Sequence, residues 1–292
     1  MKNNFCFITK KQYVLDSEVE DVKIELKRNN FEITDQIRLG EDGVVLMLRN
    51  FFPRDFTPLE QALELDINFS VKPIELKKLL LADMDSTIIS SECIDELAEY
   101  AGARNEIRAI TKKAMAGKVD FKDALEQRVK LLRGLTLQQL TDCYNNKIHL
   151  NKGAKTLVKT MRSLGATSAL VSGGFSFFAD KVATNVGFDK AYANHLLITN
   201  DKVSGTVEKP ILGVHEKQKI LQKLCSEGNF EFGDVIAVGD GANDVEIIRN
   251  AGIGVSYYGK AILRKTSDFK LHYSNLRALL YFQGIKETKF VT

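Results

Sequence analysis

The chain has 292 residues, 44% of them hydrophobic, and its 41 basic and 38 acidic residues leave a net charge of +3. This length and composition favour a globular protein with one large or two modest domains. The near balance of charge argues against a broad basic surface for nucleic acid or for an anionic membrane. A local site must therefore carry the function.

The four cysteines (Cys6, Cys93, Cys143 and Cys225) lie far apart, with no CxxC pair and no histidine at zinc spacing. This spacing argues against a disulfide framework and against a structural zinc site. No apolar run approaches the roughly 20 residues that span a bilayer, and the N-terminal segment lacks the apolar core of a signal peptide. We therefore expect a cytoplasmic protein with reduced thiols. Monomer and homodimer both stay open.

Residues 1–75 predict a small α+β domain. Short apolar runs at residues 5–8 and 44–48 are separated by an amphipathic stretch at residues 19–26. Pro73 stands just before the next apolar run, and we place a linker there. Nothing in this segment indicates a function.

The rest of the chain predicts an α/β core. Four short apolar runs have the character of buried strands, at residues 79–82, 167–171, 235–238 and 252–255. Segments of helical period separate them. Alternation of this kind implies a three-layer, Rossmann-like parallel sheet with helices on both faces.

Residues 93–150 predict a helical insert in that core. The segment carries several helical patterns and no convincing strand pattern, and Thr136 with Gln139 has the spacing of a capping box. The core is then residues 76–92 and 151–292. Because the insert separates the first two predicted strands, we expect it to cover the carboxyl end of the first one.

Aspartates follow two of the predicted strands. Asp83 and Asp85 come after the first, and residues two apart on an extended chain point the same way. Asp240 and Asp244 follow the run 235–238. Ligands of open α/β sheets bind at the carboxyl ends of strands, so these carboxylates should meet if the strands are neighbours. Clustered carboxylates repel one another, and one Mg2+ ion with oxygen ligands would neutralise them.

Two further features are suited to binding phosphate. A Ser-Gly-Gly segment at residues 172–174 follows the second strand and precedes a helix expected from Phe175, so its backbone N–H groups could face a phosphate. A plain strand-to-helix turn is the alternative for this segment taken alone. Lys217 opens a helical segment ahead of the third strand and could reach the same place. Lys219 is expected to be solvated.

These motifs together resemble those of the haloacid dehalogenase-like phosphatases and, within that family, the phosphoserine phosphatases. The resemblance runs from about residue 79 to residue 258 and rests on the sequences DMDST, SGG, a lysine and GDGAND. It implies that Asp83 is a nucleophile that becomes an aspartyl-phosphate. It also implies that Asp85 protonates the leaving alcohol and then activates water.

The resemblance implies a ligand set as well. One Mg2+ would be held by Asp83, the main-chain carbonyl of Asp85 and Asp240, with Asp244 supporting the metal site. The phosphoryl group would be contacted by residues of three motifs: Ser172, Gly173, Lys217 and Asn243.

The insert carries the resemblance that bears on substrate. Glu92 matches a glutamate that binds the ammonium group of the substrate, and Arg128 matches an arginine that binds the substrate carboxylate. Met115 and Phe121 match residues that line the site. Independently, a helical wheel places Arg128 within an apolar stripe formed by Phe121, Leu125 and Leu132. A charge at that place needs a partner, unless it reaches out to solvent.

The implied function is Mg2+-dependent hydrolysis of O-phospho-L-serine to L-serine and phosphate, a step of serine biosynthesis. Two alternatives stay open. One is a phosphatase or phosphotransferase acting on another small phosphomonoester, and the other is a non-catalytic regulatory protein on the same fold. Residues 255–261 lack the small-residue and proline run common in the family, so we expect a different loop there.

Overall fold

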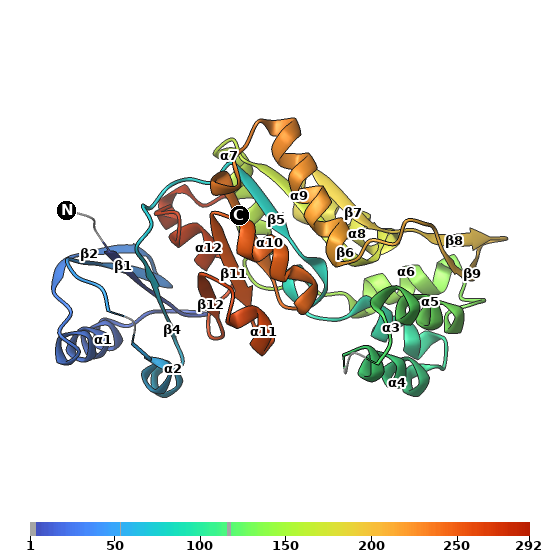
Figure 1. Ribbon diagram of the computed structural model, residues 1–292, viewed down its shortest axis with the longest axis horizontal. Coiled ribbons are helices and arrows are strands. Elements are labelled where there is room, and N and C mark those ends of the chain that lie inside the picture. Colours follow the sequence, from blue (N-terminus) through green and yellow to red (C-terminus); the bar gives the residue numbers. More distant parts are fainter. Residues whose placement is uncertain (1–3, 53, 116–117) are drawn as a thin grey trace. The chain divides into compact units, whose positions relative to one another are not determined.

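A computed structural model describes residues 4–52, 54–115 and 118–292 (Figure 1). The chain divides into two compact units. The first comprises Met1–Leu80, Lys152–Thr167 and Phe230–Thr292, and the second comprises Leu81–Asn151 and Ser168–Asn229. No helix in the described part of the chain is both long and apolar enough to cross a membrane.

The N-terminal part is an antiparallel sheet with the strand order β2-β3-β1-β4. Its elements in chain order are β1 (Asn4–Thr9), α1 (Asp16–Arg28), β2 (Ile33–Gly40), β3 (Gly43–Leu48), α2 (Thr57–Leu63) and β4 (Asp66–Ser70). The amphipathic α1 buries Val19, Val22 and Leu26 in one hydrophobic cluster with the inward residues of the sheet. The predicted α+β domain is confirmed.

The core is a six-stranded sheet with the order β12-β11-β10-β5-β6-β7. The strands are β5 (Leu79–Ala82), β6 (Thr167–Phe175), β7 (Lys190–Asn194), β10 (Val235–Gly239), β11 (Ile253–Tyr257) and β12 (Phe269–Leu271). β6 with β7, β10 with β11, and β11 with β12 pair in parallel. The predicted parallel α/β sheet is confirmed, and each of the four predicted runs is one of its strands.

The helices that follow or precede these strands are α7 (Ala154–Ser163), α8 (Ser176–Val186), α9 (Val214–Gly228), α10 (Val245–Asn250), α11 (Ala261–Arg264) and α12 (Ala278–Tyr281). A hairpin of β8 (Leu196–Thr199) and β9 (Lys202–Val207) stands between β7 and α9 in the chain.

The described residues of the insert form α3 (Cys93–Tyr100), α4 (Arg104–Met115), α5 (Phe121–Leu131) and α6 (Leu137–Lys147). The helical insert is therefore confirmed. Its capping box is also present, because Gln139 N donates to Thr136 Oγ1 at 3.1 Å and Thr136 N donates to Gln139 Oε1 at 2.9 Å. The limits 1–75, 76–92 with 151–292, and 93–150 stay predictions.

The Ser-Gly-Gly segment differs from its prediction. It does not open a helix, because β6 continues through it to Phe175 and α8 begins at Ser176. Val171 pairs with Tyr192, and Phe175 pairs with Asn194. Residues 172–174 of β6 therefore lie opposite the single residue 193 of β7. The segment is therefore an irregularity within a strand, and pairing with β7 is what extends the strand beyond it.

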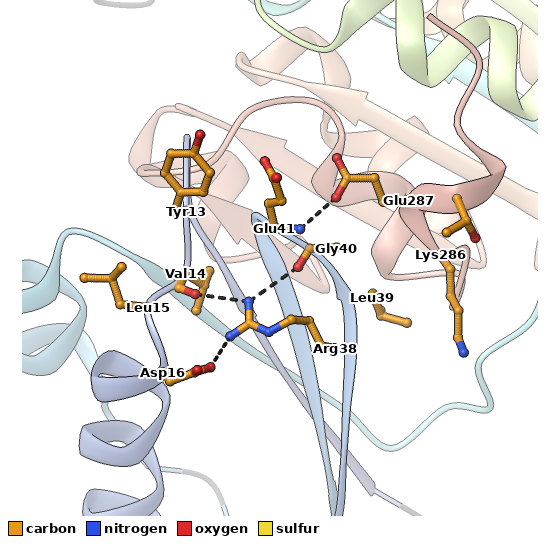
Figure 2. Close-up of a pocket in the computed structure, with 11 residues that line it drawn as sticks. Tyr13, Val14, Leu15, Asp16, Arg38, Leu39, Gly40, Glu41, Lys286 and Glu287 are labelled. Atoms are coloured by element: carbon orange, nitrogen blue, oxygen red, sulfur yellow. Dashed lines mark hydrogen bonds and ion pairs between the residues drawn. The ribbon is translucent and has the colours of Figure 1, made fainter.

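A surface pocket of about 670 Å³ lies in the first unit, lined by residues 13–16, 38–41 and 286–288 (Figure 2). Arg38 in this pocket donates to the carboxylate of Asp16 at 2.6 Å and to the main-chain oxygen of Val14 at 3.1 Å. Glu41 N donates to Glu287 Oε2 at 2.7 Å. These bonds tie the lining segments to one another.

Asp66 at the start of β4 is a buried carboxylate. It accepts hydrogen bonds from the backbone N–H groups of His272, at 2.8 Å, and Tyr273, at 3.1 Å. Burial nevertheless raises the pKa of Asp66 to about 6. Nearby Glu60 shares the effect, since burial raises its pKa to about 7.

We expect the free energy of unfolding to depend on pH through the ionisation of Asp66. Its folded-state pKa lies above its unfolded value, so the stability that Asp66 contributes is fully present below about pH 4 and is lost as pH rises through about 6. Asp66→Asn cannot ionise. Its free energy of unfolding should therefore rise relative to wild type by about 3 kcal/mol between about pH 4 and pH 7. Urea denaturation across this range measures the difference, and exposed Asp35→Asn is the control. A difference that does not vary with pH contradicts the prediction.

Candidate active site

Asp83 is placed by the buried strand β5. Residues 79–82 are fully buried, and Asp83 follows them with 4% of its surface exposed. A tight turn over residues 84–88 comes next, in which Ser86 has a φ of +56°. A non-glycine residue in the left-handed region is strained, and such strain is concentrated at functional sites.

Lys217 pairs with Asp83. Lys217 lies in the first turn of α9, and its Nζ is 2.6 Å from Asp83 Oδ1, with the two side chains only 1% and 5% exposed. The same turn is capped by Glu216, whose Oε2 accepts from Gly213 N at 3.2 Å. Lys219 is exposed, as predicted. The pair orients Asp83 and places a positive charge beside it.

Asp85 points to β6 and to the start of α3. Its Oδ1 accepts from Cys93 N at 2.8 Å, and its Oδ2 accepts from Ser172 Oγ at 3.1 Å. Burial raises the pKa of Asp85, which outweighs these hydrogen bonds and favours the protonated acid. A carboxyl group of raised pKa is suited to donate a proton.

Cys93 is a buried thiol beside that acid. Burial first, and the Asp85 carboxylate second, raise the pKa of Cys93 well above its usual range. Burial thus disfavours the thiolate, which is the form of a cysteine that acts as a nucleophile. What the sequence did not reveal is the backbone N–H of Cys93, which holds Asp85.

The Ser-Gly-Gly segment passes close to Asp85. A Cβ atom added to Gly174 would stand 2.7 Å from Asp85 Oδ2 and 3.0 Å from Ser172 Oγ. Gly174 N donates to Ser172 Oγ at 2.8 Å, and the main-chain oxygen of Gly173 accepts from Asn194 Nδ2 at 2.9 Å. Only glycine lets the backbone approach the acid this closely.

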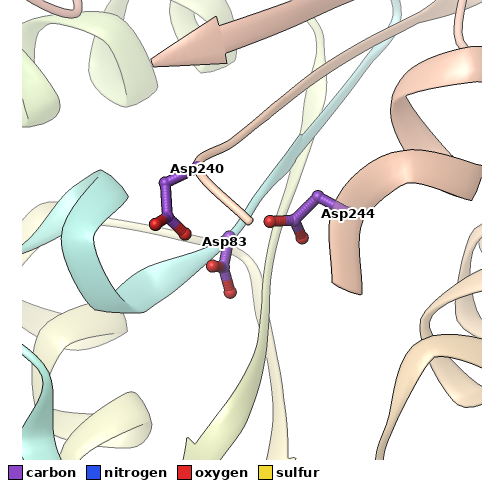
Figure 3. A group of neighbouring side chains, drawn as sticks. All are labelled: Asp83, Asp240 and Asp244. Carbon is purple, nitrogen blue, oxygen red and sulfur yellow. The ribbon is translucent and has the colours of Figure 1, made fainter. Parts of the chain in front are cut away.

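A carboxylate cluster completes the centre. One carboxylate oxygen from each of Asp83, Asp240 and Asp244 lies within 4.8 Å of the others, and all three residues are buried (Figure 3). Gly241 N donates to Asp244 Oδ2 at 3.2 Å. Buried carboxylates repel one another, and a divalent cation between them would neutralise that repulsion. Carboxylate oxygens are also the ligands that hard cations such as Mg2+ prefer. The cluster is therefore a candidate metal site.

Gly239 and Asn243 lie at the edges of this cluster. A Cβ atom on Gly239 would meet Asp244 Cγ at 2.4 Å, so a side chain at residue 239 would displace Asp244. Asn243 is half-buried, and its Oδ1 is 2.4 Å from the position that a Cβ on Gly241 would take. The glycines of GDGAND thus leave room for the polar side chains around them.

The insert brings Glu92 and Arg128 toward one another. Glu92 precedes α3 and accepts from Ser86 Oγ at 2.8 Å. Arg128 Nε donates to the main-chain oxygen of Ala124 at 3.1 Å, and its Nη1 reaches Thr111 Oγ1 at 3.5 Å. Burial lowers the pKa of Arg128, while the carboxylates of Asp95 and Glu92 oppose that effect. Arg128 is therefore a half-buried cation among acids.

Phe121, the first residue of α5, lies against two glycines. Its ring atoms are 3.3 Å from the position of a Cβ on Gly173 and 3.2 Å from that of a Cβ on Gly213. Phe121 thus packs on both the Ser-Gly-Gly segment and the cap of the Lys217 helix. Met115 ends α4, and its side chain lies outside the described residues.

One charged neighbour of the cluster was missed by sequence reasoning. Lys260 Nζ lies 3.5 Å from Asp240 Oδ2. Its position just beyond the end of β11 is the signal that could have found it, because β10, which pairs with β11, and β5, the next strand of the sheet, also deliver site residues at their carboxyl ends.

The chain is similar to known proteins in sequence and in fold. Residues 77–252 match the family model of the haloacid dehalogenase-like hydrolases. A phosphoserine phosphatase of Methanocaldococcus jannaschii is 36% identical over 206 residues, which cover 70% of this chain and 97% of that protein. One of Archaeoglobus fulgidus is 40% identical over 203 residues, and the match covers 70% of this chain but 59% of that relative's length.

The crystal structure of a probable phosphoserine phosphatase from Vibrio cholerae has the same fold over a longer stretch. It superposes with a TM-score of 0.82 at 26% identity, covering 99% of this chain and 88% of that one. The N-terminal sheet domain is therefore shared with a solved structure. By its motifs, its sheet and its sequence match, the chain belongs to the haloacid dehalogenase-like hydrolase family.

Proposed function

We propose that this chain hydrolyses O-phospho-L-serine to L-serine and phosphate through an aspartyl-phosphate on Asp83, and so supplies L-serine for biosynthesis. The observation that carries the proposal is the pairing of buried Asp83 with Lys217 at 2.6 Å, next to an Asp85 whose pKa is raised by burial. Relatives named phosphoserine phosphatase support the choice of substrate.

The two chemical steps use the two aspartates of the first motif. An oxygen of Asp83 attacks phosphorus and the bond to the serine oxygen breaks, while Asp85 gives its proton to that oxygen. Asp85, now a carboxylate, takes a proton from water as the water oxygen attacks phosphorus. The acyl-phosphate bond then breaks, and Asp83 is restored.

The remaining groups position the phosphoryl group and neutralise its charge, which is most of what such a transfer requires. We propose contacts from Ser172, Gly173, Lys217 and Asn243. Mg2+ is the proposed cation, held by Asp83, the main-chain carbonyl of Asp85 and Asp240, with Asp244 in support. When bound, it would offset negative charge on the phosphoryl oxygens.

The insert is the proposed source of substrate choice. Glu92 is suited to the ammonium of a phosphorylated amino acid and Arg128 to its carboxylate, because a guanidinium binds a carboxylate in bidentate fashion. Met115 and Phe121 are proposed to line the space between them. We also propose that residues 93–150 move as one domain, apart from the core of residues 76–92 and 151–292, to admit substrate and exclude water. Residues 1–75 would form a separate domain.

A panel of phosphomonoesters tests the substrate. Phosphoserine should be turned over with Mg2+ far faster than sugar phosphates, and phosphate release measures this. Phosphoethanolamine is the sharpest comparison, since it keeps the ammonium and lacks the carboxylate. Added alcohol acceptors, with analysis of products, would reveal a phosphotransferase instead.

Arg128→Ala should lower kcat/KM for phosphoserine by about 10²-fold, because a partly buried carboxylate loses its partner. For phosphoethanolamine, the kcat/KM of Arg128→Ala should be within about threefold of the wild-type value, since this substrate has no carboxylate to bind. Arg108→Ala, at an exposed arginine of α4, is the control. An equal loss on both substrates would contradict the role of Arg128.

A further inference from the structure

The segment between β11 and α11 is tied to Asp240 at two points. Lys260 N donates to the main-chain oxygen of Asp240 at 2.8 Å, while Lys260 Nζ faces Asp240 Oδ2 at 3.5 Å. A Cβ on Gly259 would stand 3.2 Å from that same main-chain oxygen, so the loop lies directly on Asp240. The main-chain contacts fix the position of the Lys260 backbone, and the Lys260 side chain reaches the Asp240 carboxylate.

The two partners differ in exposure. The side chain of Lys260 is 52% exposed, whereas that of Asp240 is 12% exposed. The ammonium therefore reaches an enclosed carboxylate from the solvent side and can leave it at little desolvation cost. Asp240 is one of three clustered carboxylates, whose mutual repulsion a nearby cation relieves.

We propose that Lys260 is a resident counter-cation that competes with a divalent cation for Asp240 and thereby weakens the affinity of the carboxylate cluster for that cation. The proposal rests on the metal-dependent function proposed above. A divalent ion held by Asp240 would lie within about one screening length, ~8 Å, of the ammonium, so the two repel each other. The lysine would also keep the cluster partly neutralised while the ion exchanges.

Binding of Mg2+ to the metal-stripped chain of 292 residues tests this by isothermal titration calorimetry. Lys260→Gln should bind Mg2+ about three- to tenfold more tightly than wild type at low salt, and the gain should shrink as salt rises. Lys260→Arg, which keeps the charge, should bind as wild type does. Lys265→Gln is the matched control, because it removes the same charge from an exposed lysine just beyond α11.

Thermal melting supplies a second readout that does not depend on activity. In chelator, Lys260→Gln should melt below Lys265→Gln, because the cluster has lost its counter-charge. Saturating Mg2+ should remove that difference. A merely structural loss from the substitution would persist with Mg2+.

Equal Mg2+ affinities of Lys260→Gln and Lys265→Gln, or weaker binding to Lys260→Gln, would overturn the role of Lys260 and leave the proposed function standing. Absence of Mg2+ binding by wild type and every variant would overturn both this proposal and the metal dependence proposed above.

Discussion

Asp83→Asn is expected to lower phosphoserine turnover by at least about 10⁴-fold, the largest loss we predict for a single substitution. A carboxamide cannot form the acyl-phosphate, so hydrolysis loses its covalent route. Steady-state phosphate release measures the loss. Asp180→Asn, at an exposed aspartate of α8, should behave as wild type.

The same substitution leaves Lys217 without the carboxylate that it contacts at 2.6 Å in a buried place. Breaking one side of a buried ion pair destabilises a protein by about 3–5 kcal/mol, so folding must be separated from chemistry. The double variant Asp83→Asn with Lys217→Met removes both charges. We expect it to recover much of the lost thermal stability and none of the turnover. Turnover by folded Asp83→Asn within tenfold of wild type would exclude Asp83 as the nucleophile.

Asp85→Asn is expected to lower phosphoserine turnover by about 10²- to 10⁴-fold, because the serine oxygen must leave with a proton. The Oδ1 of asparagine can still accept from Cys93 N, and its Nδ2 can donate to Ser172 Oγ once that hydroxyl turns, so the geometry should survive. An aryl phosphate such as p-nitrophenyl phosphate has a leaving group that needs no proton. Its first step should therefore be much less affected.

Stopped-flow kinetics with the aryl ester checks both roles of Asp85. Nitrophenolate should appear in a burst equal to the enzyme concentration, followed by a slow phase, because water activation is also lost and the aspartyl-phosphate accumulates. Equal losses on phosphoserine and the aryl ester, without a burst, would show that Asp85 is not the proton donor.

The strands that could be predicted are those with continuous apolar runs. β5, β6, β10 and β11 lie inside the sheet and are buried on both faces, so their sequences are distinctive. β7 and β12 were missed. They are the two edge strands, β7 is mostly half-buried and β12 has three residues, so neither carries a strong apolar signal.

The site was predictable in its charges and less so in its hydrogen bonds. Asp83, Asp85, Asp240 and Asp244 were found because each follows a buried run, and the structure brings three of them together. Cys93 holds Asp85 through a backbone N–H, which every residue except proline possesses, so residue identity gives no signal. Thr111 contacts Arg128 from 17 residues away in the chain, which no local pattern records.

Asp83 and its motif, the four buried strands of the sheet and the family follow from the sequence by itself, because apolar runs and the aspartates after them are local features. Only the tertiary structure decided the rest. It buried the Lys217–Asp83 pair, raised the pKa of Asp85, extended β6 through the Ser-Gly-Gly segment and set Arg128 among acids. Burial and long-range pairing arise only when residues far apart in the chain come into contact in the folded protein. The pKa of an ionisable group depends on those contacts.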